Sequence, residues 1–297
     1  GPSRRCVSVD GDADRLVYFR AKNDDNDGSA ELLDGDKIAA LVATRVTDLL
    51  ERCAPSNAFD PPLRVGVVQT AYANGASTAY VRDVLGVECA CANTGVKFLH
   101  PAAETFDVGV YFEANGHGTA VFSDATIERL DAAIERLDAG ADGGPVGSID
   151  THSTDAVAAL RELKAMTEAI NPAVGDALSG ILVVEAVLLA KGWGLTEWGN
   201  MYADLPSRQV KVTVRDRSVI TVTDAERVAV TPDGMQAAID EAVGRHGAHA
   251  RAFARPSGTE DVVRVYAEAA TEAGAAELAR EVCGIVYDFA GGIGDRP

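Results

Sequence analysis

A strand, a helix and a second strand follow one another closely within residues 64–92. Apolar residues dominate 64–69, Ser77 is placed to cap a helix that runs through Leu85, and 88–92 has the composition of a second strand. A helix between two strands is the usual crossover of a parallel pair, because parallel strands need a long connection. This order predicts an α/β fold with a sheet that is at least partly parallel.

The sequence before and after this unit extends the same domain. Ile38, Leu41, Val42 and Val46 recur at three- and four-residue spacing after Asp34, as they would on the apolar face of a helix. The further expected elements are strands at 108–112 and 119–122 and helices at 127–139, from Thr154, and after Asn171-Pro172, where Pro172 would lie in the first turn and Gly192 would cap the end.

The last third of the chain reads as a smaller α+β unit. Its expected elements are strands near 209–214, 219–222, 248–254 and 261–268, a helix at 234–243, and a closing helix with Thr271 as its cap that ends at Gly291-Gly292. About ninety residues is a plausible size for such a domain.

The overall charge excludes two classes of partner. The chain has 45 acidic and 27 basic residues and a net charge of −18, which disfavours binding to nucleic acid or to an anionic membrane surface. The longest apolar run, 178–190, is interrupted by Glu185 and is too short to span a bilayer. Five cysteines without paired CxxC spacing predict free thiols, as expected in the cytoplasm.

Three carboxylates alternate immediately after the short strand pattern at 6–9. In an extended segment Asp10, Asp12 and Asp14 project to one side, so their oxygens can converge on a cation. Three hard oxygen ligands favour Mg²⁺, Ca²⁺ or Mn²⁺ over zinc. The loop therefore predicts a cation site, with a solvated acidic turn as the alternative.

The residues after the third carboxylate argue against a calcium EF-hand. An EF-hand would need glycine and glutamate where Arg15 and Ala21 stand. A cation beside three anions also suggests a further anionic partner at this loop.

A second candidate site is the loop Arg255-Pro256-Ser257-Gly258-Thr259-Glu260. An arginine, two hydroxyls and backbone N–H groups at a glycine turn can bind phosphate oxygens, and Arg264 on the next strand could add a second cation. The alternative is an ordinary hydrogen-bonded hairpin turn. The sequence contains no GxxxxGK[ST] phosphate loop.

Three loops together resemble, in their order along the chain, the α-D-phosphohexomutase superfamily. They are the Asp-rich loop at 10–15, Glu-Ala-Asn-Gly-His at 113–117 and Arg-Pro-Ser-Gly-Thr-Glu at 255–260. Within that superfamily 113–117 and the segment Asn-Thr-Gly-Val-Lys-Phe-Leu-His at 93–100 are similar to the phosphoacetylglucosamine mutases, as are 171–176 and 204–208. The similarity covers essentially residues 4–297.

The resemblance implies reversible conversion of N-acetylglucosamine 6-phosphate and N-acetylglucosamine 1-phosphate on the cytoplasmic route to UDP-N-acetylglucosamine. It implies a phosphoserine, a bisphosphate intermediate and Mg²⁺ as cofactor, held by Asp10, Asp12 and Asp14. Arg15 and Lys97 would act at the reacting phosphoryl group and sugar. The residues implied to bind the sugar are Thr94, Gly95, Lys97, His100, Glu113, Asn115 and His117. Those implied to bind the non-transferring phosphate are Arg255, Ser257, Gly258, Thr259 and Arg264.

The sequence departs from the family at the nucleophile. The family carries its phosphoserine in a Ser-His loop of an N-terminal domain, and this sequence has no such segment. We therefore expect 1–29 to be a tag scar (Gly1-Pro2-Ser3) plus a remnant of the second domain, 30–200 the third, a mixed α/β sheet domain, and 207–297 the fourth, an α+β domain.

A chain without the phosphoserine is expected to be inactive alone, to bind metal weakly, and to need the missing N-terminal part of the same protein as its partner. Two alternatives remain open at this stage. One is a non-catalytic module that binds sugar phosphates, and the other is a phosphoglucomutase or phosphomannomutase.

Overall fold

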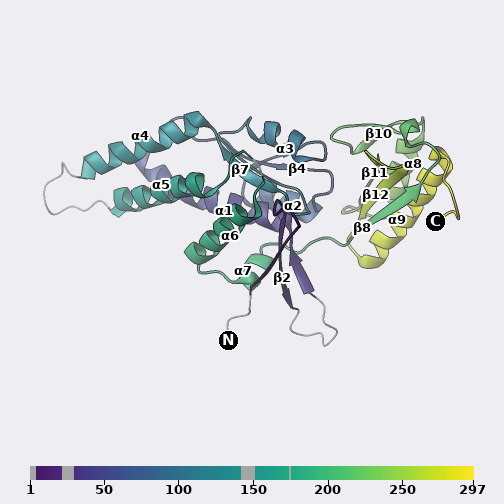
Figure 1. Cartoon of the computed structure of the whole chain (residues 1–297), viewed down its shortest axis with the longest axis horizontal. Helices are drawn as coiled ribbons and strands as arrows, with labels where there is room; N and C mark the ends of the chain where they lie inside the picture. Colours follow the sequence, from purple (N-terminus) through teal and green to yellow (C-terminus); the bar gives the residue numbers. More distant parts are fainter. Residues whose placement is uncertain (1–4, 22–29, 142–150, 174) are drawn as a thin grey trace. The chain divides into compact units, whose positions relative to one another are not determined.

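The computed structural model describes residues 5–21, 30–141, 151–173 and 175–297 (Figure 1). The chain divides into two compact units. The first unit comprises Gly1–Gln69, Ala79–Ala90 and Gly95–Tyr202, and the second comprises Thr70–Thr78, Cys91–Thr94 and Ala203–Pro297. Each unit is described by itself. Where the structure describes the chain, no helix is both long and apolar enough to cross a membrane.

The first unit contains two sheets. An antiparallel sheet is formed by β1 (Cys6–Val9), β2 (Leu16–Ala21) and β3 (Ala30–Leu33) in that order. A second sheet has the order β5 (Glu88–Cys91), β4 (Val65–Gln69), β6 (Val108–Phe112) and β7 (Gly118–Phe122). Because β4 and β6 are parallel whereas β6 and β7 are antiparallel, this sheet is mixed, which confirms the predicted α/β class. Strand β3, which begins the predicted third domain, pairs with β2 of the N-terminal sheet.

Helices surround these sheets. They are α1 (Gly35–Cys53), α3 (Val96–Ala103), α4 (Asp124–Ala141), α5 (Thr151–Ala169), α6 (Ala177–Lys191) and α7 (Leu195–Gly199), with a π-helical stretch at Tyr80–Val84 and a 3-10 turn at Ala54–Ser56. Helix α2 (Gly75–Ala79) lies almost entirely in the second unit. The Asp34 carboxylate caps α1 by accepting hydrogen bonds from the backbone N–H groups of Asp36 and Lys37. This satisfies donors that the first helical turn otherwise leaves unpaired.

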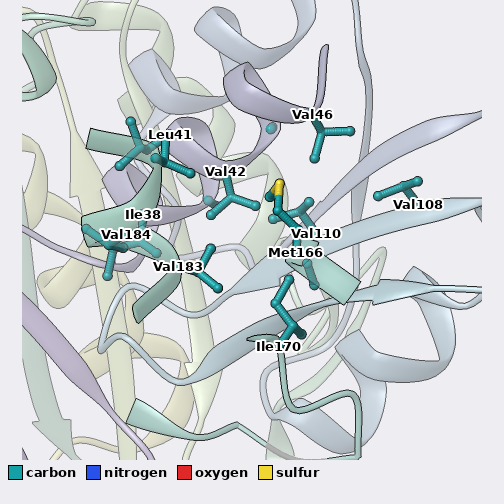
Figure 2. Close-up of a cluster of buried hydrophobic side chains, with 14 of the residues drawn as sticks. Ile38, Leu41, Val42, Val46, Val108, Val110, Met166, Ile170, Val183 and Val184 are labelled. Atoms are coloured by element: carbon teal, nitrogen blue, oxygen red, sulfur yellow. The ribbon is translucent and has the colours of Figure 1, made fainter. Parts of the chain in front are cut away.

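The predicted apolar face of α1 forms the centre of the core. Figure 2 shows its side chains packed among residues of β6, α5 and α6. The labelled residues of this cluster are Ile38, Leu41, Val42, Val46, Val108, Val110, Met166, Ile170, Val183 and Val184. A single helix thus joins the sheet to two other helices, which explains why its four apolar positions are buried.

Two predicted helix starts were wrong. Ser77 does not cap the helix after β4, because it is buried inside α2, and Asn74 accepts the capping hydrogen bond from Ala76 instead. Pro172 precedes α6 rather than lying in its first turn, because the Asp176 carboxylate caps this helix through the N–H groups of residues 178 and 179. In both cases an amide or carboxylate side chain was the stronger cap.

The second unit packs two helices with a sheet of the order β11 (Arg251–Pro256), β12 (Val262–Glu268) and β8 (Ser207–Thr213). The helices are α8 (Met235–Arg245) and α9 (Glu272–Ala290), and a 3-10 turn lies at Arg217–Val219. Strands β9 (Thr221–Thr223) and β10 (Val228–Thr231) form a separate hairpin. Thr271 caps α9 and Gly291 ends it in the left-handed conformation, as predicted.

The position of α1 in the core gives a testable stability difference. Replacing the fully buried Leu41 by alanine should lower the free energy of unfolding by about 2–5 kcal/mol, because the cavity removes packing on several elements. The matched control is Leu189→Ala on α6, where the side chain is 80% exposed and the expected change is within about 0.5 kcal/mol. Urea denaturation measures both. Equal losses in the two variants would contradict this core.

Candidate functional site

The Asp-rich loop joins β1 to β2 and is arranged around Asp10. One Asp10 carboxylate oxygen accepts the backbone N–H groups of Asp14 and Arg15, each at 3.2 Å. Although desolvation alone would raise it, these hydrogen bonds and the charge of Arg15 hold the pKa of Asp10 below its ordinary value. Asp10 is therefore kept ionised, as a metal ligand must be.

The three carboxylates fit a hard divalent cation. Asp10, Asp12 and Asp14 each offer one oxygen, and these oxygens lie within 4.8 Å of one another. The Oδ1 atom of Asp14 is buried and has no hydrogen-bond partner within the described part of the chain. An all-oxygen donor set suits a hard cation such as Mg²⁺, the ion implied by the resemblance.

Arg15 lies beside these carboxylates. Its Nε atom is 3.6 Å from Asp10 and 3.5 Å from Asp14, while about half of the side chain is exposed. The guanidinium therefore neutralises part of the acidic cluster from within the chain. The three carboxylates therefore account for Arg15 without a further anion, and the exposed part of its side chain can still contact an anionic ligand.

The loop at 113–117 is fixed directly against the Asp-rich loop. The backbone N–H of Leu16 donates to the carbonyl of Gly116, and Arg15 and His117 form an isolated antiparallel bridge. Gly116 has a φ of +87°, and a Cβ atom there would lie 1.9 Å from the Leu16 carbonyl oxygen. Only glycine permits this approach, so the two predicted loops form one site in the first unit.

His117 is enclosed between the Asp-rich loop and the segment that leads into α6. Its Nδ1 atom lies 3.5 Å from Asp14, its side chain is 13% exposed, and its Nε2 atom is buried without a hydrogen-bond partner in the described residues. A Cβ atom at Gly175 would be 2.2 Å from the imidazole ring. The chain there is tied down by the N–H of Ala177, which donates to the Ala13 carbonyl at 2.9 Å.

The other residues of the predicted sugar site occupy different environments. Glu113 accepts the backbone N–H of Gly95 at 2.9 Å, which ties the segment 93–100 to the loop at 113–117. The Asn115 side-chain oxygen accepts the N–H of His117 at 2.9 Å, and the residue is exposed. Lys97 is exposed, with its ammonium 4.9 Å from the Phe98 ring centroid.

His100 contacts residues that are not among the predicted sugar-binding residues. Its Nδ1 atom is 3.0 Å from the Tyr111 hydroxyl and its Nε2 atom is 3.4 Å from Glu104. Its ring contacts thus differ from those of His117, and a role toward substrate remains a prediction.

The second unit contains a row of basic residues on its three-stranded sheet. Arg255 on β11 is directly opposite Arg264 on β12, which is directly opposite Lys211 on β8. Directly opposite residues share one face of a sheet at about 5 Å between Cβ atoms, and like charges there destabilise the pair. The side chain of Arg264 forms no hydrogen bond and no ion pair with any residue that the structure describes. Glu226 neutralises part of the row at Arg255, and Glu260 lies 3.8 Å from Lys211. Arg264 at the centre is therefore the cation that an added anion would stabilise most.

The remaining residues of the predicted phosphate loop follow β11. The Ser257 hydroxyl is buried and accepts weak hydrogen bonds of 3.4 Å from the N–H groups of Thr259 and Glu260. Gly258 and Thr259 are exposed, and the Gly258 carbonyl accepts from Arg217. The loop thus presents its tip to solvent beside the basic row.

Glu226 is bound to both Thr94 and Arg255 within the second unit. Its carboxylate accepts the Thr94 N–H at 3.0 Å and the Thr94 hydroxyl at 2.6 Å, and lies 2.8 Å from Arg255 Nε. Burial opposes the charge, but the hydrogen bonds of Thr94 and the guanidinium of Arg255 lower the pKa of Glu226 below its usual 4.5. Thr94, predicted to bind the sugar, therefore has both donors engaged by Glu226.

The backbone that carries Glu226 is unusual. Residues Asp224, Ala225 and Glu226 have φ values of +53°, +54° and +69°, in the loop between β9 and β10. Left-handed conformations cost non-glycine residues about 1–2 kcal/mol each. The interactions of the Glu226 carboxylate offset part of that cost.

Three residues of this site were missed at the sequence level. Lys211 joins the basic row only through strand register, and Glu226 lies in what reads as an ordinary hairpin turn. The hydroxyl of Tyr72 is buried beside Arg255; burial raises the pKa of Tyr72, and the charge and hydrogen bonding of Arg255 oppose this. Alternation along 207–213 was a usable signal for Lys211, whereas the other two had none.

The approach at Gly116 should be intolerant of any side chain. Gly116→Ala should lower the free energy of unfolding by at least about 2 kcal/mol, because it adds a backbone clash to an unfavourable φ. Gly86 is the matched control, since its φ is +64° and a Cβ atom there would meet nothing within 4 Å. Gly86→Ala should therefore cost less, and thermal denaturation that ranks the two variants in the opposite order would contradict the contact.

The lowered pKa of Glu226 predicts a pH-dependent stability. A carboxylate with a depressed pKa stabilises the folded state above its usual value of 4.5, and this contribution is lost as the pH falls through the folded pKa. The difference in unfolding free energy between the native chain and Glu226→Gln should therefore be largest near neutral pH and shrink below pH 4.5. A difference that is constant from pH 7 to pH 3 would contradict this, and Glu241→Gln on an exposed helix position serves as control.

Two family models match the chain. Residues 34–193 match domain III of phosphoacetylglucosamine mutase, and residues 209–285 match the C-terminal domain of the phosphoglucomutase/phosphomannomutase family. The first match covers more than half of the chain.

Full-length relatives agree with these matches. The phosphoacetylglucosamine mutase of Mus musculus is 49% identical over 293 residues, which are 99% of this chain and 49% of that protein. The enzyme of Arabidopsis thaliana is 47% identical over 97% of this chain and 49% of its own length. The chain therefore spans about half the length of the curated relatives it matches.

Solved structures show the same fold. N-acetylphosphoglucosamine mutase from Aspergillus fumigatus, in complex with GlcNAc-6P and magnesium, has a TM-score of 0.83 and 46% identity, covering 98% of this chain and 50% of that one. An N-acetylglucosamine-phosphate mutase of the α-D-phosphohexomutase superfamily, in its substrate complex, has a TM-score of 0.83 and 42% identity over 96% and 49% of the two chains. The chain belongs to the phosphoacetylglucosamine mutase family of the phosphohexomutase superfamily.

Proposed function

We propose that this chain is the substrate-binding part of an enzyme that interconverts N-acetylglucosamine 6-phosphate and N-acetylglucosamine 1-phosphate. The observation that carries the proposal is the basic row Arg255, Arg264 and Lys211 beside the loop 256–260, in a chain whose relatives are phosphoacetylglucosamine mutases. A dianionic phosphate neutralises such a row, and arginine adds directional hydrogen bonds.

In this proposal the second unit binds the phosphate that is not transferred. Arg255 and Arg264 donate hydrogen bonds to its oxygens, Lys211 adds charge from the neighbouring strand, and the hydroxyls of Ser257 and Thr259 and the N–H of Gly258 complete the site. These groups bind and orient the substrate without taking part in bond making. Charge neutralisation and orientation are the main demands of phosphoryl transfer.

The first unit would bind the sugar and the reacting phosphoryl group. Glu113 accepts hydrogen bonds from sugar hydroxyls, Asn115 presents its amide to the N-acetyl sugar, and His117 lies beside both. Arg15 and Lys97 would neutralise charge on the phosphoryl group and on the reacting end of the sugar. Asp10, Asp12 and Asp14 would hold Mg²⁺, which when bound supplies further neutralisation of that charge.

The proposed cycle uses a phosphoserine that donates its phosphoryl group to the free hydroxyl of the sugar phosphate. The O–P bond of the serine breaks as the new O–P bond forms, giving a bisphosphate, and the other phosphate then returns to the serine. The printed sequence has no Ser-His segment of the kind that carries this serine in the family. Residues 1–297 alone are therefore proposed to bind substrate without turnover, with the N-terminal part of the same protein as partner.

The proposal places the reaction on the cytoplasmic route to UDP-N-acetylglucosamine. The net charge of −18 disfavours nucleic acid and anionic membranes, and a phosphorylated sugar would bind through the local basic row despite that charge.

The first test measures binding of N-acetylglucosamine 6-phosphate to residues 1–297 by isothermal titration calorimetry. Arg264→Ala should weaken binding about tenfold and Lys211→Ala about threefold, because the former loses hydrogen bonds as well as charge. Arg245→Ala, which removes one positive charge from exposed α8, should leave the affinity unchanged. Equal affinity of the native chain and Arg264→Ala would sink the proposed phosphate site.

A second test addresses catalysis and the sugar. Addition of the N-terminal part should restore conversion of N-acetylglucosamine 6-phosphate, followed by ³¹P NMR, with glucose 6-phosphate and mannose 6-phosphate turned over more slowly. Full activity of residues 1–297 alone would contradict the proposed division of the enzyme, and a preference for either of the other sugars would contradict the substrate.

A further inference from the structure

The phosphate arginine of the second unit is held from behind by an acidic side chain. Glu226 lies 2.8 Å from the Nε atom of Arg255, and the two side chains are only 14% and 18% exposed. Arg255 Nε is itself buried and its contact with Glu226 is an ion pair without hydrogen-bond geometry. The contact therefore lies on the inner side of the guanidinium, away from solvent.

The outer side of the same guanidinium is available. Besides Glu226, the Arg255 side chain interacts with the Tyr72 hydroxyl, and it forms no ion pair with another acidic residue that the structure describes. A guanidinium presents these two nitrogens as a fork that matches two oxygens of a phosphate. A contact at the Nε side fixes the plane of the guanidinium and leaves its two terminal nitrogens for a ligand.

Glu226 is in turn immobilised by Thr94. Both Thr94 donors, the backbone N–H and the hydroxyl, bind the second carboxylate oxygen of Glu226 at 3.0 and 2.6 Å. The loop that presents Glu226 adopts three successive left-handed residues, Asp224 to Glu226, although none of them is glycine. Such a disfavoured backbone persists only where the surrounding structure holds it, and it is typical of functional sites.

An anion beside a phosphate site has two possible effects of opposite sign. By charge alone Glu226 would compete with a phosphate for Arg255 and weaken binding. By orientation it would strengthen binding, because a fixed guanidinium loses less freedom when it binds. The ion pair at the inner Nε atom and the two Thr94 hydrogen bonds favour the orienting effect, because they hold Glu226 in place when a ligand binds.

We propose that Glu226 is a positioning residue that orients Arg255 toward the phosphate of the substrate. The inference rests on the proposed function, because it presupposes that Arg255 binds phosphate. In this role Glu226 does not touch the substrate but sets the orientation of Arg255, which does.

The test compares the affinities of native chain, Glu226→Gln and Glu226→Ala for N-acetylglucosamine 6-phosphate by calorimetry. Orientation predicts that glutamine weakens binding about fivefold and alanine more, because each removes the ion pair behind Arg255 and alanine also removes the acceptor for Thr94. A charge effect predicts the reverse, since both variants remove a negative charge next to an anion site. Affinity that is unchanged or tighter in Glu226→Gln would overturn the proposal, and Glu241→Gln on exposed α8 controls for net charge.

A second measurement needs no ligand. The Nε–H proton of Arg255, assigned by ¹⁵N NMR, should exchange slowly with water in the native chain and faster in Glu226→Gln. Fast exchange in the native chain would overturn the inference even if phosphate binds. Absence of saturable phosphate binding by the native chain would instead remove the proposed function itself, so the two failures are distinguishable.

Discussion

The first unit depends on one close approach between two backbones. The loop after β6 lies directly on the strand that follows the Asp-rich loop, so that the carbonyl of Gly116 accepts from Leu16 and a side chain at position 116 has no room. This contact brings His117 to Asp14 and sets the position of Glu113, which in turn holds Gly95. Main-chain contacts at Gly116 and the Glu113 carboxylate together bring three segments that are far apart in the sequence next to one another.

In the second unit the main constraint is electrostatic, because three positive side chains lie next to one another on one sheet. Strand register places Arg255, Arg264 and Lys211 side by side, a row that is unfavourable without an anion. Glu226 offsets part of this repulsion at Arg255, whereas Arg264 has no ion pair among the described residues. Relief of this repulsion is the reason to expect that a dianion binds here. The Asp-rich loop of the first unit is the opposite case, a cluster of negative charges that a cation would relieve.

The sequence predicted those features that repeat along the chain or lie within one loop. Helix α1 followed from the spacing of Ile38 to Val46, and the three acidic residues at 10, 12 and 14 were recognisable from alternation alone. Two helix starts were wrong because Asn74 and Asp176 cap through side chains whose partners depend on the local backbone. Alternation along 207–213 indicated the face of Lys211 but not its partner, because cross-strand register is a tertiary property, and the left-handed turn that presents Glu226 has no single-sequence signal.

A crystal structure of residues 1–297 with N-acetylglucosamine 6-phosphate tests the central claim most directly, because the position of the phosphate decides whether the basic row is the substrate site. The account predicts the phosphate within hydrogen-bonding distance of Arg255 and Arg264, with the Glu226 contact to Arg255 intact. A phosphate bound elsewhere, with Arg264 still facing solvent, would contradict it.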